Sequence, residues 1–473
     1  MSESGGSNGM DERACEVQLG GKLGGLSLPR QVFVLAIWPL LEQVLAFFVG
    51  LTDLLISARM ADGMERVAIL DAMGVGGYVA WLMAILQGAV ATGVMALVSR
   101  ATGARDDGLA NRGLGQGLWL GLAAGIGSMF LLLGAMRFLI GWIGMTPEAT
   151  VQAEAYLRVL SVSAPFSGAL FAVNAALRGS GDTRTPFLAM IVVNVVNMAL
   201  SWTLVFAPGP VGGHGIDGIA WGSVGGWLAG LAVVVLIVGR GGEGGLHWTR
   251  ECLRPHGETM RRVVRVGMPQ AMEIAGMWSI HAYGAKVISG LGSGGTLGAH
   301  ILAIRVESLS FLPGFAIATA SSALVGQYLG AGSKEMAVKA VRFSWMFAAL
   351  LMTLAGVFFF FGRYQVIGWM AAGSELHVEL AAPLLMVCAV TQPFFATCII
   401  MKTSMRGAGA THLVMAWSFS TMLFFRVLVL GLLARFTELS LVGVWVVFAV
   451  DLLVQSVVFT RLHFAGKWLD ARV

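Results

Sequence analysis

The five residues Leu-Arg-Gly-Ser-Gly at Leu177–Gly181 recur as Met-Arg-Gly-Ala-Gly at Met405–Gly409, 228 positions later in the chain. A second landmark keeps nearly the same spacing, because Pro39 corresponds to Pro269 at an offset of 230. Separate matches at almost one offset indicate that the chain is built from two similar halves. Any fold assigned to it must therefore contain an internal repeat.

Outside these landmarks the composition is that of a membrane protein. Of the 473 residues, 57% are apolar and only 12% are charged, whereas a soluble domain has about 25% charged residues. The apolar residues run continuously and do not alternate with polar ones, which argues against a membrane β-barrel. The 64 glycines are typical of closely packed membrane helices. The sequence predicts an all-α integral membrane protein.

Twelve apolar stretches are long enough to cross a bilayer, which needs roughly 20 residues per helix. Each half contains six of them, so both halves enter the membrane from the same side and are related by a pseudo-twofold axis along the membrane normal. We expect a flexible cytoplasmic tail at 1–29, lobes at 30–239 and 263–473, and a cytoplasmic linker at 240–262. The stretches are 33–57, 70–98, 114–140, 156–177, 186–207, 216–239, 263–290, 297–328, 341–361, 380–401, 411–434 and 440–463.

The Lys and Arg residues alternate between the two sides of this twelve-helix arrangement. The side with both termini carries 22, the other side carries 6, and three lie inside helices. Because cytoplasmic segments hold the excess of basic residues, both termini are predicted to be cytoplasmic, in a plasma membrane or an inner membrane. The basic residues occupy separate short loops, so nucleic acid is not an expected partner.

At the landmarks the chain resembles the multidrug and toxic compound extrusion (MATE) family of secondary transporters. This resemblance implies two six-helix lobes around a central cavity, which expel small cationic or amphipathic organic substrates in exchange for H+ or Na+. We expect a monomer surrounded by membrane lipids, with no cofactor and no bound metal. The resembling segments are Ala176–Pro186, Glu307–Ala320, Leu324–Ala331 and Leu441–Trp445.

The resemblance also implies residues for ion coupling. Asp53 matches an acidic residue of the family's first helix, and the Asn194–Asn197 pattern, with Asn at both ends, matches its fifth helix. Ser201 stands where some proton-coupled relatives carry Asp, and the stretch Ala381–Met401 lacks the acid of a sodium-coupled branch. These departures leave the coupling ion open between H+ and Na+, and we favour H+ because it needs only one base.

Ionisable residues inside the membrane are costly, so they are functional candidates in their own right. Glu42 and Asp53 are eleven residues apart, which places them within roughly 20° on one helix face. Glu273 follows Pro269 much as Glu42 follows Pro39, so the two glutamates are predicted to be repeat equivalents that face each other across the lobes. The alternative is that these acids pair with Arg or Lys and hold helices together.

Arg305 and Glu307 are a further pair of candidates, in the stretch 297–328. They are two positions apart and therefore point about 200° apart on a helix, which excludes a simple pair within the helix. Anchoring between helices and contact with the substrate are both compatible with this spacing.

Two other functions compete with a cation-coupled drug antiporter. A lipid-linked oligosaccharide flippase of related two-lobe architecture would need a basic cavity for a diphosphate, and the acids argue against it. An intramembrane enzyme would need a nucleophile with its base, a metal cluster or a phosphate-binding loop. Neither a nucleophile–base set nor a phosphate loop is evident, and the four cysteines have no metal-site spacing.

Overall fold

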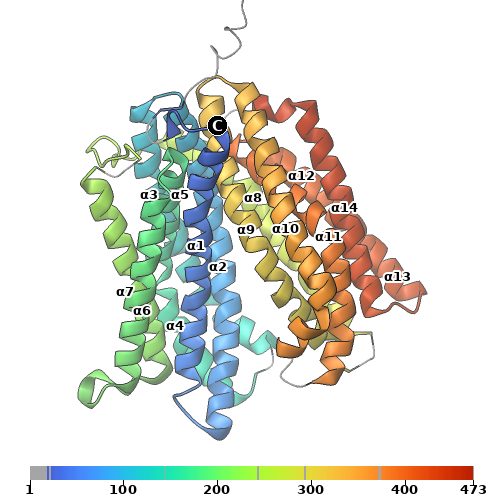
Figure 1. The fold of residues 1–473 in the computed structure, drawn as a ribbon. Helices are drawn as coiled ribbons and strands as arrows, with labels where there is room; N and C mark the ends of the chain where they lie inside the picture. The colour runs from blue at the N-terminus through green and yellow to red at the C-terminus, as the bar shows by residue number, and fades with distance from the viewer. Residues whose placement is uncertain are drawn as a thin grey trace, which may run out of the picture.

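The computed structural model describes residues 19–20, 23–143, 145–241, 244–291, 294–370 and 374–471. Most of the tail predicted at 1–29 lies outside the described residues. Within these ranges all regular secondary structure is helical (Figure 1).

The first half of the chain forms seven α-helices. They are α1 (Leu28–Ser57), α2 (Gly63–Gly103), α3 (Asp107–Ile143), α4 (Pro147–Ser161), α5 (Ala164–Ser180), α6 (Arg184–Phe206) and α7 (Gly215–Gly239).

The second half repeats this order with local differences. It contains α8 (Gly257–Ser289), α9 (Thr296–Gly330), α10 (Lys334–Met370), α11 (Glu375–Gly407), α12 (Thr411–Met422), a π-helical turn (Leu423–Val429), α13 (Leu430–Phe436) and α14 (Leu441–Ala465).

These helices account for the twelve predicted spans. Nine helical segments of the described residues, with α12 to α13 taken as one, are long and apolar enough to cross a membrane, and the pair α4–α5, bent by 48°, makes a tenth. Helices α2 and α8, which are 41 and 33 residues long, complete the twelve. The bend at α4–α5 corresponds to a continuous helix in the second half, α11, so the two repeats are similar but not identical.

The helices gather into two lobes, α1–α7 and α8–α14, as Figure 1 shows. Helix α1 packs against α9, and α8 packs against α2. The first helix of each lobe thus contacts the second helix of the other lobe, which is the arrangement that a twofold relation requires. The predicted fold class, two six-span lobes built from a repeat, is confirmed.

The repeated Arg-Gly-X-Gly sequence ends a helix in both lobes. Gly181 has φ +95° directly after α5, and Gly409 has φ +94° just beyond α11. Both values lie in the left-handed region that glycine adopts without a steric penalty. The repeat is therefore a helix-terminating motif.

The lobes touch through their backbones on the side where α1 begins and α14 ends, called the terminal side here. A Cβ atom on Gly103 would lie 1.9 Å from the carbonyl oxygen of Gln327, and one on Gly330 would lie 2.0 Å from that of Arg100. A Cβ atom on Gly267 would lie 2.2 Å from the carbonyl oxygen of Ala89. Away from this side the two lobes diverge, giving the V shape of Figure 1.

The segment that follows α14, Gly466–Ala471, reinforces this contact. The side chain of Trp468 is 1% exposed and stacks on His463 with 5.5 Å between ring centroids. At the end of the segment, the carbonyl oxygen of Ala471 accepts a hydrogen bond from Nη1 of Arg100, in the other lobe, at 2.7 Å. The second lobe therefore contacts the end of α2 in two ways, through the segment after α14 and through the glycines.

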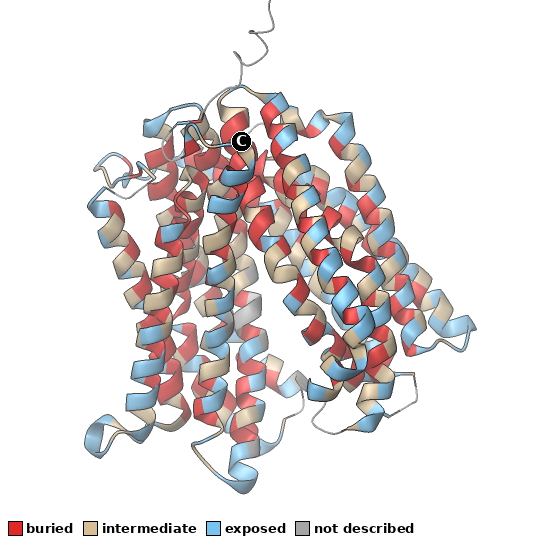
Figure 2. Ribbon diagram, viewed as in Figure 1, coloured by how far each residue is buried: buried red, intermediate tan, exposed pale blue. Residues whose placement is uncertain are grey.

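Figure 2 shows that buried residues lie along the inside of each lobe, while the outer faces are largely exposed. Large apolar side chains are among the exposed ones, including Phe138 at 73% and Phe361 at 75%. A bilayer removes such side chains from water, so this surface is consistent with a lipid environment.

We predict that Gly103→Ala destabilises the protein by about 1–3 kcal/mol, because the new methyl group overlaps the Gln327 backbone and forces the lobes apart. Gly88→Ala, on the same helix with no atom within 4 Å of the added Cβ, is the matched control and should be neutral or slightly stabilising. Thermal unfolding of both variants in the same detergent provides the comparison. Equal unfolding midpoints would show that the glycine contact is not tight.

Candidate ion-coupling site

Asp53 lies buried in the part of α1 farthest from the terminal side. Its Oδ2 accepts a hydrogen bond from Oγ of Ser223 at 3.1 Å, and that hydroxyl oxygen accepts one from Nδ2 of Asn197, also at 3.1 Å. Oδ1 of Asp53 and Oδ1 of Asn197 are both buried and have no hydrogen-bond partner among the described residues. The site therefore contains two acceptor oxygens available to a proton or a cation.

Close packing of α6 on α7 brings these side chains together. A Cβ atom on Gly222 would lie 2.0 Å from Oγ of Ser201, and one on Gly226 would lie 3.0 Å from Cβ of Asn197. Side chains larger than hydrogen at these positions would separate the two helices. The glycines of α7 thus set the position of Ser223 relative to Asn197.

The two asparagines predicted as site residues have different surroundings. Asn197 belongs to the Asp53 cluster, whereas Nδ2 of Asn194 donates to the carbonyl oxygen of Met190 in its own helix at 2.8 Å. Residues three positions apart on a helix differ in direction by about 60°. The structure therefore brings Asn197, and not Asn194, into contact with the cluster.

Glu42 and Glu273 form buried ion pairs within their own lobes. Oε1 of Glu42 lies 2.5 Å from Nη2 of Arg178, and Oε2 of Glu273 lies 2.9 Å from Nη2 of Arg406. The two arginines are the equivalent residues of the repeated Arg-Gly-X-Gly motif. The two glutamates thus have equivalent partners, because each one binds the arginine at the end of α5 or α11 in its own lobe. This is the pairing with arginine that the alternative reading of these acids predicts.

The second lobe contains a larger buried network around Asp451 in α14. Nε of Arg426 donates to Oδ2 of Asp451 at 2.5 Å, and Nε2 of Gln455 donates to Oδ1 at 2.9 Å. Nζ of Lys402 in turn donates to Oε1 of Gln455 at 2.5 Å. Both carboxylate oxygens of Asp451 are therefore occupied. Arg426 lies in the π-helical turn Leu423–Val429, an irregularity that often marks functional positions.

Arg305 and Glu307 lie on α9, in the lobe opposite to Asp53. The side chain of Arg305 is exposed, whereas Glu307 is partly buried and hydrogen-bonds to the side chain of Cys388. Glu307 is also close enough to Arg426 for an electrostatic interaction. The two residues thus have separate surroundings in the structure.

No group of three His, Cys, Asp or Glu residues that could hold a metal ion occurs in the described part of the chain. The cysteines that the structure describes, Cys252, Cys388 and Cys398, are free thiols.

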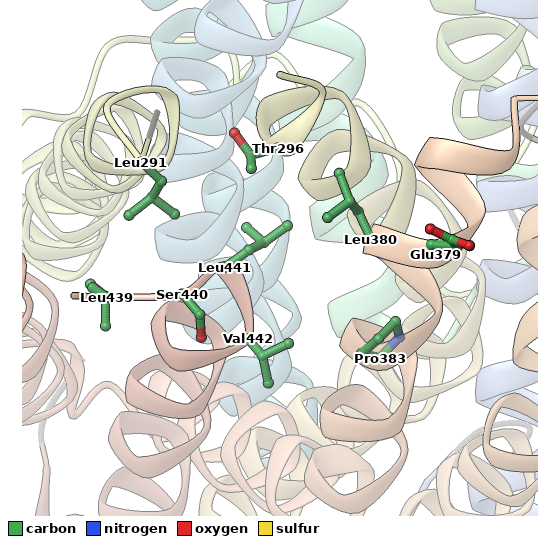
Figure 3. A pocket seen from close by; sticks show the side chains of 9 residues that line it. All are labelled: Leu291, Thr296, Glu379, Leu380, Pro383, Leu439, Ser440, Leu441 and Val442. Carbon is green, nitrogen blue, oxygen red and sulfur yellow. The ribbon is translucent and has the colours of Figure 1, made fainter. Parts of the chain in front are cut away.

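A cavity of about 240 Å³ opens at the end of the second lobe that is remote from the terminal side (Figure 3). Its walls are mostly apolar, and Glu379 is the one acid among the residues that line it. None of the predicted site residues contributes to this cavity. The lining residues are Leu291, Thr296, Glu379, Leu380, Pro383, Leu439, Ser440, Leu441 and Val442.

Several residues of these clusters were not among the sequence candidates. Nothing in the sequence marks Ser223 as a site residue, apart from its position in a glycine-rich helix. Lys402 lies one residue beyond the predicted span 380–401, but α11 continues to Gly407 and places it inside the lobe. The Arg-Gly-X-Gly repeat was the available signal for the counter-ions Arg178 and Arg406.

The fold and these buried polar clusters define an integral membrane protein made of two repeated helical lobes. The MatE family model matches residues 39–203 and 269–430, one match in each lobe. The chain therefore belongs to the MatE family, a family of multi-pass membrane transporters and not of enzymes.

Individual relatives agree with this assignment. The chain is 25% identical over 442 residues to a probable multidrug resistance protein NorM of Thermotoga maritima, covering 93% of each chain. A solved structure described as the outward-facing conformation of a multidrug resistance MATE transporter matches with TM-score 0.85 and 21% identity, over 94% of this chain and 98% of the other. A MOP superfamily transporter from Pyrococcus furiosus, described as having a binding pocket of reverse polarity, matches with TM-score 0.84, 21% identity and the same coverage.

We predict that Arg178→Gln destabilises the protein by about 3 kcal/mol, because it leaves the Glu42 carboxylate buried without its counter-ion. The double variant Glu42→Gln, Arg178→Gln should recover most of this loss. Arg66→Gln, which breaks an exposed pair with Asp62 at the start of α2, is the control and should change stability by less than about 1 kcal/mol. Additive effects of the two buried changes in thermal unfolding would contradict a coupled pair.

Proposed function

We propose that this protein is a secondary active antiporter that exports small organic cations in exchange for H+, with Asp53 as the coupling acid. One observation carries the proposal: Asp53 is a buried intramembrane carboxylate with no Lys, Arg or His counter-ion among the described residues. A buried carboxylate of this kind can hold either a proton or a cation, which is what an exchange site requires.

Comparison with the other intramembrane acids supports this choice. Glu42, Glu273 and Asp451 each contact an arginine directly. Glu307 interacts electrostatically with Arg426. Among the described residues, Asp53 is held by the neutral side chains of Ser223 and Asn197, so its charge can be met by a transported ion without first breaking an ion pair.

The charge pairing in the second lobe favours H+ over Na+. A metal ion that prefers oxygen ligands needs several of them at once, whereas a proton needs one base. Both oxygens of Asp451 accept hydrogen bonds from Arg426 and Gln455, and Glu273 is bound to Arg406. These acids therefore offer few oxygens for a sodium site. We accordingly propose that the coupling ion is H+ and that it binds in the first lobe.

Alternating access follows from the arrangement of the two lobes. The distribution of Lys and Arg predicts that the terminal side is cytoplasmic, with both termini inside the cell. Contacts between the lobes then close the cytoplasmic side, and the divergence on the opposite side corresponds to an outward-facing state. Protonation of Asp53 from outside would displace the bound cation. Exchange of one H+ for one monovalent cation moves no net charge, so the pH gradient drives it, with about 1.4 kcal/mol per pH unit.

The relatives support a multidrug role, because the Thermotoga protein carries the name multidrug resistance protein. The flippase alternative gains no support from the buried cations: Arg406 and Arg426 bind carboxylates, and Lys402 binds Gln455. These groups are consequently not arranged to receive a diphosphate.

We predict that Asp53→Asn reduces uphill export of a fluorescent organic cation to background, since Asn keeps the shape but cannot exchange a proton. In vesicles with the purified protein, a pH gradient should drive the wild type in sodium-free buffer. Ser223→Ala removes one hydrogen bond of roughly 1 kcal/mol and should alter the pH midpoint of transport without abolishing it. Full activity of Asp53→Asn would remove Asp53 from the mechanism, and transport that required Na+ would overturn the proton assignment.

The orientation of the protein in the membrane can be tested separately. In a variant whose native cysteines are replaced, a cysteine introduced at Arg250 should react with a membrane-impermeant maleimide only after the membrane is opened. A cysteine introduced at Gly209, in the turn between α6 and α7 on the opposite side, should react in intact cells. The reverse pattern would place the termini outside.

A further inference from the structure

Two hydrogen bonds near the ends of α2 and α9 join the lobes at the terminal side. Nε2 of Gln327 in α9 donates to the carbonyl oxygen of Gly179 in α5 at 2.8 Å. Nη1 of Arg100 in α2 donates in the opposite direction, to the carbonyl oxygen of Ala471. Gln327 follows Arg100 by 227 positions, and each lies three residues before the end of its helix. The two bonds are therefore repeat equivalents and fit the twofold relation of the lobes.

Another hydrogen bond between the lobes lies outside this twofold plan. The hydroxyl of Tyr328 in α9 donates to Oε1 of Gln31 in α1 at 2.6 Å, and both side chains are buried. At the same offset of 227 the first lobe has Ala101, whose methyl group cannot donate a hydrogen bond. The contact between Tyr328 and Gln31 is thus an addition that only one of the two repeats makes.

Gln31 also holds the segment that precedes α1, Leu23–Ser27, which is called the strap here. Its Nε2 donates to the carbonyl oxygens of Leu23 at 3.2 Å and of Leu26 at 3.0 Å. Gly25 has φ +73°, a left-handed conformation that lets the strap turn without a steric penalty. One amide side chain therefore binds the strap through its nitrogen and the second lobe through its oxygen.

The strap places Leu23 in the seam between the lobes, where the ends of α5 and α9 meet. The side chain of Leu23 is 3% exposed and belongs to one buried apolar cluster with Leu324 and Trp468 of the second lobe. A Cβ atom on Gly181, directly after α5, would lie 3.7 Å from Cδ1 of Leu23 and 3.6 Å from Nε2 of Gln327. The strap thus packs against both lobes at once.

We propose that the strap and the Gln31–Tyr328 hydrogen bond form a latch that holds the terminal side closed and is released when the lobes separate there. The inference rests on the alternating access of the proposed function, but on neither the coupling ion nor the transported substrate. Separation of the lobes parts Tyr328 from Gln31 and exposes Leu23, so the latch stabilises the closed state alone. The strap therefore sets how often the terminal side opens.

The latch consists of uncharged groups, unlike the buried ion pairs inside each lobe. Separating Glu42 from Arg178 would leave a buried charge uncompensated, which suits a contact that stays closed. The Tyr328 hydroxyl and the Gln31 amide can instead exchange each other for water once the lobes part, so the net cost of breaking their bond is small. This difference suits a contact that opens and closes repeatedly.

The test measures conformation and involves no export. Double electron–electron resonance between spin labels on cysteines introduced at Asp107 and Glu335, exposed residues at the start of α3 and α10, reports the separation of the lobes at the terminal side. The sample is the purified full-length protein with its native cysteines replaced. Tyr328→Phe should raise the ratio of open to closed molecules by about threefold to tenfold, as expected for one neutral hydrogen bond. Tyr364→Phe removes the same atom from an exposed position of α10 and should change the ratio by less than about twofold.

A double variant connects the hydroxyl with the strap. Gln31→Met removes both the acceptor for Tyr328 and the donor that holds the strap, so it should open the terminal side at least as much as Tyr328→Phe. Adding Tyr328→Phe to Gln31→Met should then change the ratio by less than about twofold, because the acceptor is already gone. Leu23→Ala should also raise the ratio, whereas Leu350→Ala, on the exposed face of α10, should leave it unchanged.

Thermal unfolding in the same detergent checks that the variants remain folded. An unchanged ratio in Tyr328→Phe would overturn the latch, and so would equal effects of Tyr328→Phe and Tyr364→Phe. Because the sample contains neither a pH gradient nor an organic cation, this result would leave proton exchange at Asp53 untouched. Full export by Asp53→Asn would likewise remove the coupling acid and leave the latch in place.

Discussion

The architecture depends on one constraint, the direct backbone contact between the two lobes at the terminal side. Glycines of α2, α8 and α9 permit this approach, since a methyl group at Gly103, Gly267 or Gly330 would overlap a carbonyl oxygen of the other lobe. The contact closes one side of the molecule and allows the opposite ends to diverge.

Charge pairing divides the buried ionisable groups into two kinds. Acids with an arginine partner, such as Glu42 and Glu273, join helices within a lobe, and losing either partner would leave a buried charge uncompensated. Among the described residues, Asp53 has hydrogen-bonding neighbours that are neutral and an oxygen without a partner. This difference in surroundings, and not the type of residue, separates the candidate coupling acid from the structural ones.

The two lobes share a plan but distribute polar residues differently. The second lobe contains Lys402, Gln455, Asp451 and Arg426 in a continuous hydrogen-bonded network, and a π-helical turn holds Arg426 within it. In the first lobe, a three-residue cluster around Asp53 is built on closely packed glycines of α7.

The sequence by itself determined the twelve spans and the two halves, because hydrophobic length is a local property of the chain and a repeat is visible at a fixed offset. It also identified Asp53 and Asn197 as candidates. Only the tertiary structure decided that Glu42 binds Arg178, 136 positions away, that Ser223 completes the Asp53 cluster, and that Asn194 turns to its own backbone. These contacts depend on how helices distant in sequence are rotated against one another, and hydrophobic periodicity alone leaves that rotation undetermined.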